Sequence, residues 1–271
     1  AYQRMLMPSQ FQGHGMTNIK RLSSGAFLFA AIVSLNASAE TTGHGWTYDG
    51  EHGPAHWGAM SEAFNTCESG RAESPIDIEK AKKAPADMPR LNVNYQPLPI
   101  DIINTGHAVQ FNAMPGTNSI SLGSQAYQLV QFHFHSPGEE RFAGKDSVMD
   151  AHLVHRSADG KLLVLAVQFE IGDQPNPVIQ TMLDRIPKEK GAEFKINEVM
   201  VNPLDLLPKQ KGYYTYNGSL TTPPCSEGVT WIEFKEHMAI TQQQLDAMQR
   251  FYRGNQRPVQ ALNGRDIWEV E

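Results

Sequence analysis

A histidine-rich stretch, Gln131–His155, constrains the fold of this chain more than any other segment. It begins with a strict alternation of polar and aromatic residues, which is typical of a β-strand and puts His133 and His135 on the same face. A second predicted strand, Asp150–Val154, carries His152. If these two strands are antiparallel neighbours, the three imidazoles converge on one point.

Three neutral imidazole nitrogens, with a fourth corner left to water, form the ligand arrangement of a catalytic zinc site. Taken alone, two histidines on one strand face are more often solvent-facing or satisfied core residues than metal ligands. The neighbouring residues change that balance, because Gln131 stands two residues before His133 and Asp150 two before His152. Each strand therefore offers a hydrogen-bond partner on its ligand's own face, and such partners fix the tautomer of ligating histidines.

The N-terminal part has the pattern of an export signal. Residues 16–39 combine a basic start, the apolar run Gly25–Leu35 and the small residues Ala37–Ala39. They predict a secretory signal peptide, since the apolar run is too short to span a membrane. Residues 1–15 precede a candidate initiator methionine and are interpreted as a vector-derived or upstream extension. We therefore expect a folded chain of residues 40–271.

The charge of this expected mature chain limits its partners. It holds 20 basic and 29 acidic residues, which argues against nucleic acid or an anionic membrane as a partner. Its length is sufficient for one large domain with an ample core. The two cysteines, Cys67 and Cys225, predict one disulfide in an exported protein; two buried free thiols are the alternative.

Short strands dominate the remaining pattern, with few helices and no sign of a repeat or a linker between domains. This predicts a single β-dominated α+β domain. The expected strands are Val93–Tyr95, Ile100–Asn104, Ala108–Asn112, Ser119–Leu122, Gln125–His135, Leu162–Ile171, Tyr213–Tyr216, Val229–Lys235 and Met238–Ile240. The expected helical segments are Ala59–Cys67, parts of Asn176–Arg185 and Phe194–Leu206, and a helix that begins with a capping box at Thr241 and Gln244.

A second segment with chemical potential is the loop Asn217–Glu227. Its two prolines, Pro223 and Pro224, remove backbone donors and fix φ, so the loop is stiff. Such stiffness suits a site that must hold a hydroxyl and a backbone N–H in fixed positions. An ordinary proline-rich turn tethered by Cys225 explains the same residues equally well.

Eight short motifs occur in a fixed order over residues 40–271, and together they resemble the alpha-class carbonic anhydrases, in particular the secreted bacterial type. They are Trp46–Tyr48, Gly53–Gly58, Glu73–Ile78, Asn104–His107, Gln131–His135, His152–His155, Gly218–Cys225 and Asn255–Pro258. The resemblance implies a large, twisted, mostly antiparallel sheet with short surface helices and a conical cleft that ends at zinc. It also implies a periplasmic monomer or homodimer that has no nucleic-acid partner and no membrane association after removal of the signal.

The implied activity is the reversible hydration of carbon dioxide to bicarbonate and a proton, by attack of zinc-bound hydroxide. The resemblance assigns His133, His135 and His152 as zinc ligands. It makes Thr221 a gatekeeper hydroxyl that donates a hydrogen bond to Glu139. The remaining implied roles are a proton shuttle (His107), a substrate pocket (Val154, Val164, Leu220, Thr221, Thr222 and Trp231), partners of the ligands (Gln131, Asp150 and the backbone of Asn255), a disulfide (Cys67 with Cys225) and cis-prolines (Pro75 and Pro224).

Two positions depart from the family pattern. Glu140 stands where histidine is usual, and Asp150 stands where glutamate is usual. Two carboxylates would then occupy the place of a hydrogen-bonded histidine–glutamate pair, and like charges that close force one group to stay protonated. We expect either that Asp150 and Glu140 share a proton or that Glu140 turns away.

Three other functions compete with this interpretation. A non-catalytic, carbonic-anhydrase-like zinc-binding module typically lacks one of the zinc histidines, whereas this chain has all three. A periplasmic zinc-storage protein or chaperone typically has long histidine-rich or acidic tracts, which the sequence lacks. Ester hydrolysis at the same zinc is expected only as a side activity.

Overall fold

The computed structural model describes residues 45–271. The predicted signal peptide, residues 16–39, and the extension, residues 1–15, lie outside the described residues. Within 45–271, no helix is long and apolar enough to cross a membrane.

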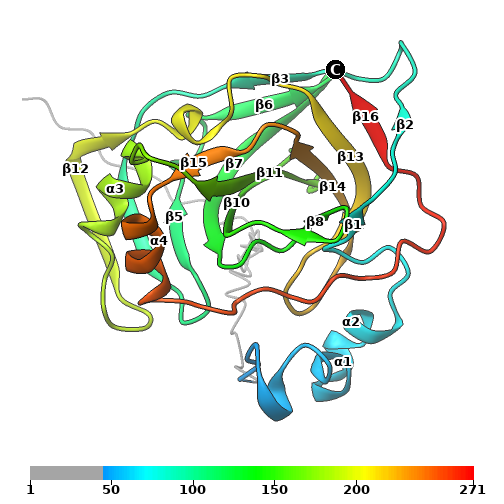
Figure 1. Cartoon of the computed structure of the whole chain (residues 1–271), viewed down its shortest axis with the longest axis horizontal. Helices are drawn as coiled ribbons and strands as arrows, with labels where there is room; N and C mark the ends of the chain where they lie inside the picture. The colour runs from blue at the N-terminus through cyan, green and yellow to red at the C-terminus, as the bar shows by residue number, and fades with distance from the viewer. Residues whose placement is uncertain (1–44) are drawn as a thin grey trace, which may run out of the picture. The chain divides into compact units, whose positions relative to one another are not determined.

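One large mixed sheet of 13 strands forms the centre of the fold, with most neighbours antiparallel (Figure 1). The strand order along its main path is β12-β4-β5-β7-β10-β11-β14-β13-β16-β2, with β3, β6 and β15 attached to it. The strands are β2 (Lys82–Lys83), β3 (Leu91–Asn94), β4 (Leu98–Asn104), β5 (Val109–Asn112), β6 (Ser119–Leu122), β7 (Gln125–His135), β10 (Met149–Arg156), β11 (Leu162–Ile171), β12 (Glu193–Val201), β13 (Tyr213–Ser219), β14 (Glu227–Phe234), β15 (Met238–Ile240) and β16 (Trp268–Val270). Parallel pairs occur in this sheet at β11–β14, β11–β15 and β16–β2.

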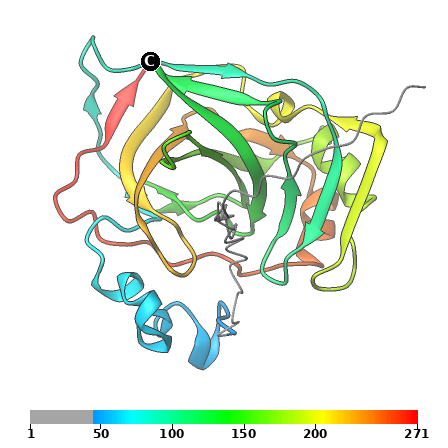
Figure 2. The same cartoon turned by 180° about the vertical axis from the view of Figure 1, so that it is seen from behind.

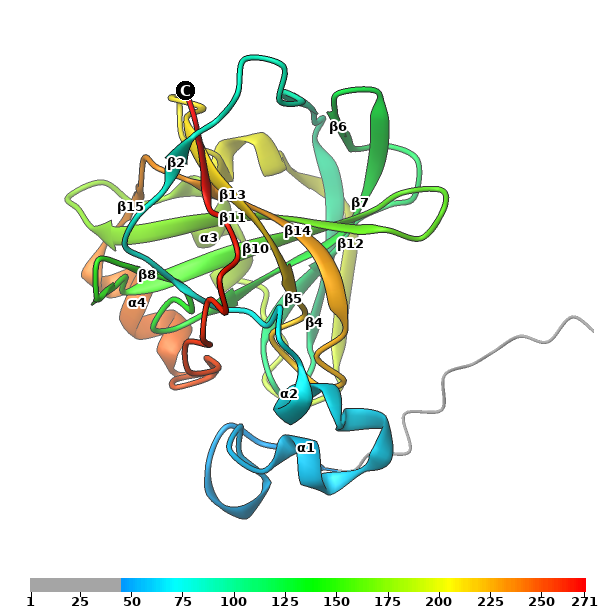
Figure 3. The same ribbon diagram turned by 90° about the vertical axis from the view of Figure 1, so that its right-hand side faces the viewer.

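The helices are few and short, as expected. They are α1 (Trp57–Met60), α2 (Thr66–Ser69), α3 (Pro177–Leu183) and α4 (Gln242–Gln249), with 3-10 turns at Gly50–His52, Glu62–Phe64 and Pro203–Leu206. The predicted capping box at the start of α4 is present, because Thr241 and Gln244 bond each other's backbone N–H. Figure 3 shows α1 and α2 together at one end of the sheet, and Figure 1 shows α3 beside α4.

One sequence-based expectation was only partly right. Phe194–Leu206 was expected to be helical in part, and Pro203–Leu206 does form a 3-10 turn, but most of the segment is the strand β12, which lies at one edge of the sheet in Figure 2. Pairing with β4 decides this, since Ile196 stands opposite Ile100 in the antiparallel ladder. The polar connection from Ser136 to Met149 has the pattern of a hairpin-type return, and it does contain a hairpin, formed by β8 (Arg141–Phe142) and β9 (Lys145–Asp146). β8 also pairs with β1 (Asp77–Ile78).

The alternation in β7 determines which face of the sheet becomes the core. Phe132 and Phe134 are buried in the larger apolar cluster, together with Leu153 and Leu165 of the neighbouring strands. Full burial of each such side chain contributes roughly 1.5–3 kcal/mol. A slip of one residue would expose this whole set, so the register is strongly specified. His133 and His135 consequently lie on the opposite face of β7.

Candidate metal centre and active site

The ladder between β7 and β10 brings the three predicted ligands together. The strands are antiparallel neighbours, with His152 directly opposite His133 and Asp150 directly opposite His135. One nitrogen from each of His133, His135 and His152 lies within 4.8 Å of the others. His135 and His152 are buried, and His133 is half-buried. The sheet register therefore assembles a triad from residues up to 19 positions apart.

Hydrogen bonds orient two rings of the triad. Nδ1 of His133 is 2.8 Å from Oε1 of Gln131. Nδ1 of His135 is 2.9 Å from Oδ1 of Asp150. These bonds make both Nδ1 atoms the N–H donors and leave Nε2 of His133 and Nε2 of His135 with free lone pairs. Nε2 of His152 lies 3.2 Å from Oδ2 of Asp150 but forms no hydrogen bond among the described residues.

Asp150 serves two of the three histidines at once. Its Oδ1 also accepts the backbone N–H of His135 at 3.2 Å, and its Oδ2 accepts that of Glu139 at 2.7 Å. Burial alone would raise the pKa of Asp150, but the charges and hydrogen bonds of His152 and His135 outweigh burial and lower that pKa. Asp150 is therefore held as a carboxylate between the two rings.

The family resemblance implied that the backbone of Asn255 is a partner of a zinc ligand. In the structure, the ring hydrogen bonds of His133 and His135 go to Gln131 and Asp150. Asn255 instead acts through its side chain. Its Oδ1 accepts the N–H of Ser136, and its Nδ2 donates to the carbonyl oxygens of Phe134 and His107. The amide thus connects the end of β7 to the turn that carries His107.

Glu140 does not turn toward solvent. It is fully buried, with Oε2 at 3.5 Å from Nε2 of His152. Its Oε1 accepts a hydrogen bond from the hydroxyl of Tyr216, which also contacts Oγ of Ser74 at 3.0 Å. Glu140 thus stands beside Asp150 as a second buried carboxyl group, as one of the two sequence-based alternatives requires.

Sequence analysis missed a further buried carboxyl group, Glu233 on β14. It is fully buried, and Nε2 of the equally buried Gln168 lies 3.5 Å from its Oε2. Burial, reinforced by the charge of Glu140, raises the pKa of Glu233 well above its usual value. The signal that could have found it is an acidic residue at a core position of the apolar strand Val229–Lys235.

The gatekeeper pair is only partly assembled. Oε1 of Glu139 accepts the backbone N–H of Arg257 at 2.8 Å. Oε2 of Glu139 lies 3.8 Å from Nδ1 of His135 and 3.8 Å from Nδ1 of His152. This oxygen is buried and has no hydrogen-bond partner among residues 45–271, Thr221 included. It therefore remains able to accept a hydroxyl proton.

An apolar wall stands next to the triad, as the predicted substrate pocket requires. Val164 and Trp231 are buried in the smaller apolar cluster, and Val154 and Leu220 pack against it. The ring of Trp231 lies edge-on to His152, with 4.9 Å between the ring centroids. Thr222 follows Thr221 in the loop between β13 and β14, where its carbonyl accepts the N–H of Cys225.

Comparison with known proteins decides the family. Residues 52–271 match the family model described as "Eukaryotic-type carbonic anhydrase". The chain belongs to the carbonic anhydrase family. A carbonic anhydrase of Neisseria gonorrhoeae is 38% identical over 248 residues, which is 90% of this chain and 95% of that protein. The alpha-carbonic anhydrase structure of Photobacterium profundum is 39% identical, with a TM-score of 0.76 over 82% of this chain and 99% of that one. A hyperthermostable carbonic anhydrase from a hydrothermal vent chimney gives a TM-score of 0.79 at 39% identity, over 83% of this chain and all of that one.

Family membership makes this chain an enzyme of the carbonic anhydrase type, and its triad fits the family's zinc. The fit rests on the donor set, because three imidazole nitrogens lie within 4.8 Å of one another and two of the three rings are held by a hydrogen-bonded partner. The predicted disulfide between Cys67 and Cys225 is present and joins the N-terminal helices to the loop after β13. The peptide bonds before Pro75 and Pro224 are cis, as the family resemblance implied.

His107, the predicted shuttle, lies in the turn after β4 and is half-buried. Its ring stacks on Trp46, with 3.7 Å between centroids and 10° between planes, and its Nε2 is 3.1 Å from the carbonyl oxygen of Trp46. Burial lowers the pKa of His107, and the charge of Lys190 lowers it further, against the raising effect of the Trp46 carbonyl.

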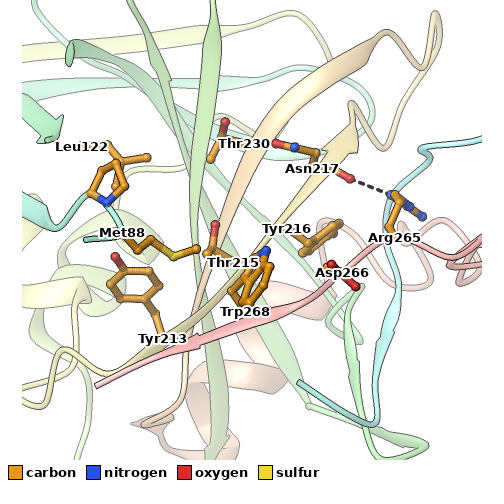
Figure 4. A pocket seen from close by; sticks show the side chains of 11 residues that line it. Met88, Leu122, Tyr213, Thr215, Tyr216, Asn217, Thr230, Arg265, Asp266 and Trp268 are labelled. Carbon is orange, nitrogen blue, oxygen red and sulfur yellow. Dashed lines mark hydrogen bonds between the residues drawn. The ribbon is translucent and has the colours of Figure 1, made fainter. Parts of the chain in front are cut away.

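A separate cavity of about 500 Å³ lies away from these residues (Figure 4). Tyr213, Thr215 and Trp268 are among its lining side chains, and it contains none of the predicted site residues.

Proposed function

We propose that this protein catalyses the zinc-dependent reversible hydration of carbon dioxide, with His133, His135 and His152 as the zinc ligands. One observation supports this most directly: one ring nitrogen from each histidine lies within 4.8 Å of the others, while Gln131 and Asp150 hydrogen-bond the rings of His133 and His135. Zinc bound there would lower the pKa of a coordinated water to about 7, a value established on carbonic anhydrases themselves, and so supply a nucleophile at neutral pH.

The partners of the ligands keep the site ready for metal. Gln131 and Asp150 hold the rings in the tautomers that a metal requires, so the site loses little entropy when it loads. Asp150 also adds a negative charge that increases the basicity of the two rings it contacts. Glu140 lies beside it as a second buried carboxyl group.

Thr221 and Glu139 would orient the reacting oxygen. Glu139 uses one oxygen to accept the N–H of Arg257, which leaves Oε2 for the hydroxyl of Thr221. With its own proton donated to Glu139, Thr221 can only accept a hydrogen bond from the nucleophile. That restriction points a lone pair of the nucleophile at the substrate.

The apolar wall and its flanking loop would hold the substrate. Val154, Val164 and Trp231 offer carbon dioxide a surface that binds water weakly, with Leu220 beside them. Thr222 would contact the product at the polar side of the pocket. Bicarbonate, being charged, is better solvated by water than by this wall and leaves.

His107 would carry the surplus proton away from the site. A histidine has a pKa close enough to neutral to accept and release a proton in each cycle. We also propose that residues 16–39 direct export to the periplasm, which the Cys67–Cys225 disulfide supports. Sequencing the N-terminus of protein recovered from a periplasmic extract tests the export, and a chain that retains residues 16–39 would contradict it.

Stopped-flow hydration of carbon dioxide tests the proposed function. The zinc-loaded protein should accelerate the reaction, lose activity when a chelator removes zinc, and recover when zinc is returned. A folded, fully zinc-loaded protein without hydration activity would instead favour a zinc-binding module.

A further inference from the structure

Two buried polar atoms beside the triad face each other and have no hydrogen-bond partner. Nε2 of His152 and Oε2 of Glu140 lie 3.5 Å apart, and neither forms a hydrogen bond among residues 45–271. The two side chains are at most 2% exposed, so bulk water does not reach these atoms. A buried polar atom without a partner is costly, and pairing these two atoms with each other removes both costs at once.

Asp150 is the nearer carboxyl group, but both of its oxygens already serve other donors. Oδ1 accepts the backbone and ring N–H groups of His135, and Oδ2 accepts the backbone N–H of Glu139 at 2.7 Å. Oδ2 lies 3.2 Å from Nε2 of His152, yet these two atoms form no hydrogen bond. At this separation the direction of the N–H, rather than the distance, prevents the bond.

Glu140 is held in place through its side chain and its backbone. Its Oε1 accepts the hydroxyl of Tyr216 at 3.2 Å, and that hydroxyl also contacts Oγ of Ser74 at 3.0 Å. Its backbone directly precedes β8, where the N–H of Arg141 donates to the carbonyl oxygen of Ile76 at 3.1 Å. Because Oε1 is occupied and the backbone is fixed, Oε2 is the oxygen left for the third histidine of the triad.

We propose that Glu140 is the positioning residue of His152, with its Oε2 accepting the N–H at Nε2 so that Nδ1 is left for zinc. The proposal rests on the proposed function, because it assumes that the triad binds metal. Both departures from the family pattern meet at this contact: Asp150 is one methylene shorter than the usual glutamate, and Glu140 brings a second carboxyl group. Asp150 thus serves His135, and Glu140 serves His152.

A charged acceptor at Nε2 has two effects on the ring of His152. It fixes the tautomer, and it increases the basicity of the opposite nitrogen, because a charge-assisted hydrogen bond is stronger than a neutral one. Glu140→Gln keeps the size of the side chain and one acceptor oxygen but removes the charge. Zinc affinity should therefore fall by ~10–100-fold, the range for lost partners of ligating histidines.

Competition with a zinc chelator measures the affinity of Glu140→Gln and of a matched control, Glu233→Gln. Glu233 is as fully buried as Glu140, and it lies close enough to His152 for their charges to interact. Its side chain is directed to Gln168, however, with 3.5 Å between Oε2 and Nε2 of that amide. Glu233→Gln should therefore bind zinc with an affinity near the wild-type value, although it also removes a buried carboxyl group.

Nitrogen-15 NMR of the imidazole groups supplies a readout that a purely structural effect would not move. In zinc-loaded wild-type protein, the proton on Nε2 of His152 should resonate far downfield and exchange slowly, because its acceptor is charged and buried. Glu140→Gln should move this resonance upfield, and Glu233→Gln should leave it in place. The wild-type spectrum tests the contact even if a variant fails to fold.

Four results would overturn the proposal. The first is a zinc affinity that is unchanged in Glu140→Gln, or that falls equally in Glu233→Gln, since an equal fall reports buried charge in general. The second is a His152 resonance that is not downfield in the wild type or does not move in Glu140→Gln. The third is two metal ions per wild-type chain, because Glu140, Asp150 and His152 would then hold a second ion. The fourth is a wild-type chain that binds no zinc, which contradicts the proposed function as well.

The two proposals can fail separately, because neither measurement uses the hydration reaction. A protein that shows the expected affinities and spectra but hydrates no carbon dioxide contradicts the proposed function and supports the role of Glu140. An active enzyme whose zinc affinity is the same in Glu140→Gln contradicts the role of Glu140 alone.

Discussion

His152 and His155 lie three residues apart on β10, but their rings have different surroundings and different partners. His152 faces the site, where one of its nitrogens lies within 4.8 Å of nitrogens of His133 and His135 and where its Nε2 forms no hydrogen bond among the described residues. His155 lies on the core side beyond a register shift, where both nitrogens have protein partners. The hydroxyl of Tyr95 lies 2.5 Å from its Nε2, and Nδ1 lies 3.3 Å from the carbonyl oxygen of Leu163.

The difference shows what makes a buried histidine a ligand. Both rings are fully or almost fully buried, so burial does not distinguish them. The number of hydrogen-bonded nitrogens does: a ring with a nitrogen free of protein partners keeps a lone pair for a metal, whereas a ring bonded on both sides is a satisfied core residue. The partners of the two histidines, more than the histidines themselves, carry the functional distinction.

The largest expected effect separates the two residues by activity. His152→Ala should reduce zinc-dependent hydration by about 10³-fold or more, since the metal-generated nucleophile is lost. His155→Gln should retain hydration, because it touches no ligand. Stopped-flow hydration rates and the zinc content per chain are measured for both variants. A wild-type rate in His152→Ala would show that His152 is not required as a ligand.

The second expected effect is a loss of folding stability at low pH, and it is caused by His155. Burial lowers the pKa of His155 to about 3, against an ordinary value of 6.5. Between these values the unfolded chain binds a proton that the folded chain does not, so stability falls as pH falls, by about 1.4 kcal/mol for each pH unit. Urea unfolding from pH 7 to pH 4 should show a shallower decline in His155→Gln than in the wild type. If the free energy of unfolding falls equally with pH in the two proteins, His155 does not cause the acid sensitivity.

A smaller effect, on zinc affinity, should follow from removing the charge of Asp150, which contacts His135 and His152. Asp150→Asn preserves shape but removes the charge that His135 and His152 share, so zinc affinity should fall near the upper end of the ~10–100-fold range for such losses. Competition with a metal chelator measures the affinity. Unchanged affinity would mean that the contacts of Asp150 do not support the metal.

The smallest expected loss of zinc affinity should follow from replacing Gln131, which contacts the ring of one ligand, His133. Gln131→Ala frees only the ring of His133, so zinc affinity should fall about tenfold, the lower end of that range. The same chelator competition applies. A loss larger than that of Asp150→Asn would reverse the proposed ranking of the two partners.

Much of the site was predictable from local sequence. Alternation in Gln131–His135 determines which side chains face the site, because a strand repeats every two residues. The even spacing of Asp150 and His152 does the same for the second strand, and the order of the short motifs indicated the family. These inferences succeeded because they depend on backbone periodicity, which neighbouring residues largely control.

Tertiary structure alone decided the rest. That Asp150 bonds the ring of His135, that Glu140 and Glu233 are both buried, and that β12 is a strand all depend on which distant segments lie alongside each other. Hydrogen-bond partners and charge environments are set by side-chain distances of a few ångströms across the fold, and no repeat along the chain encodes those distances.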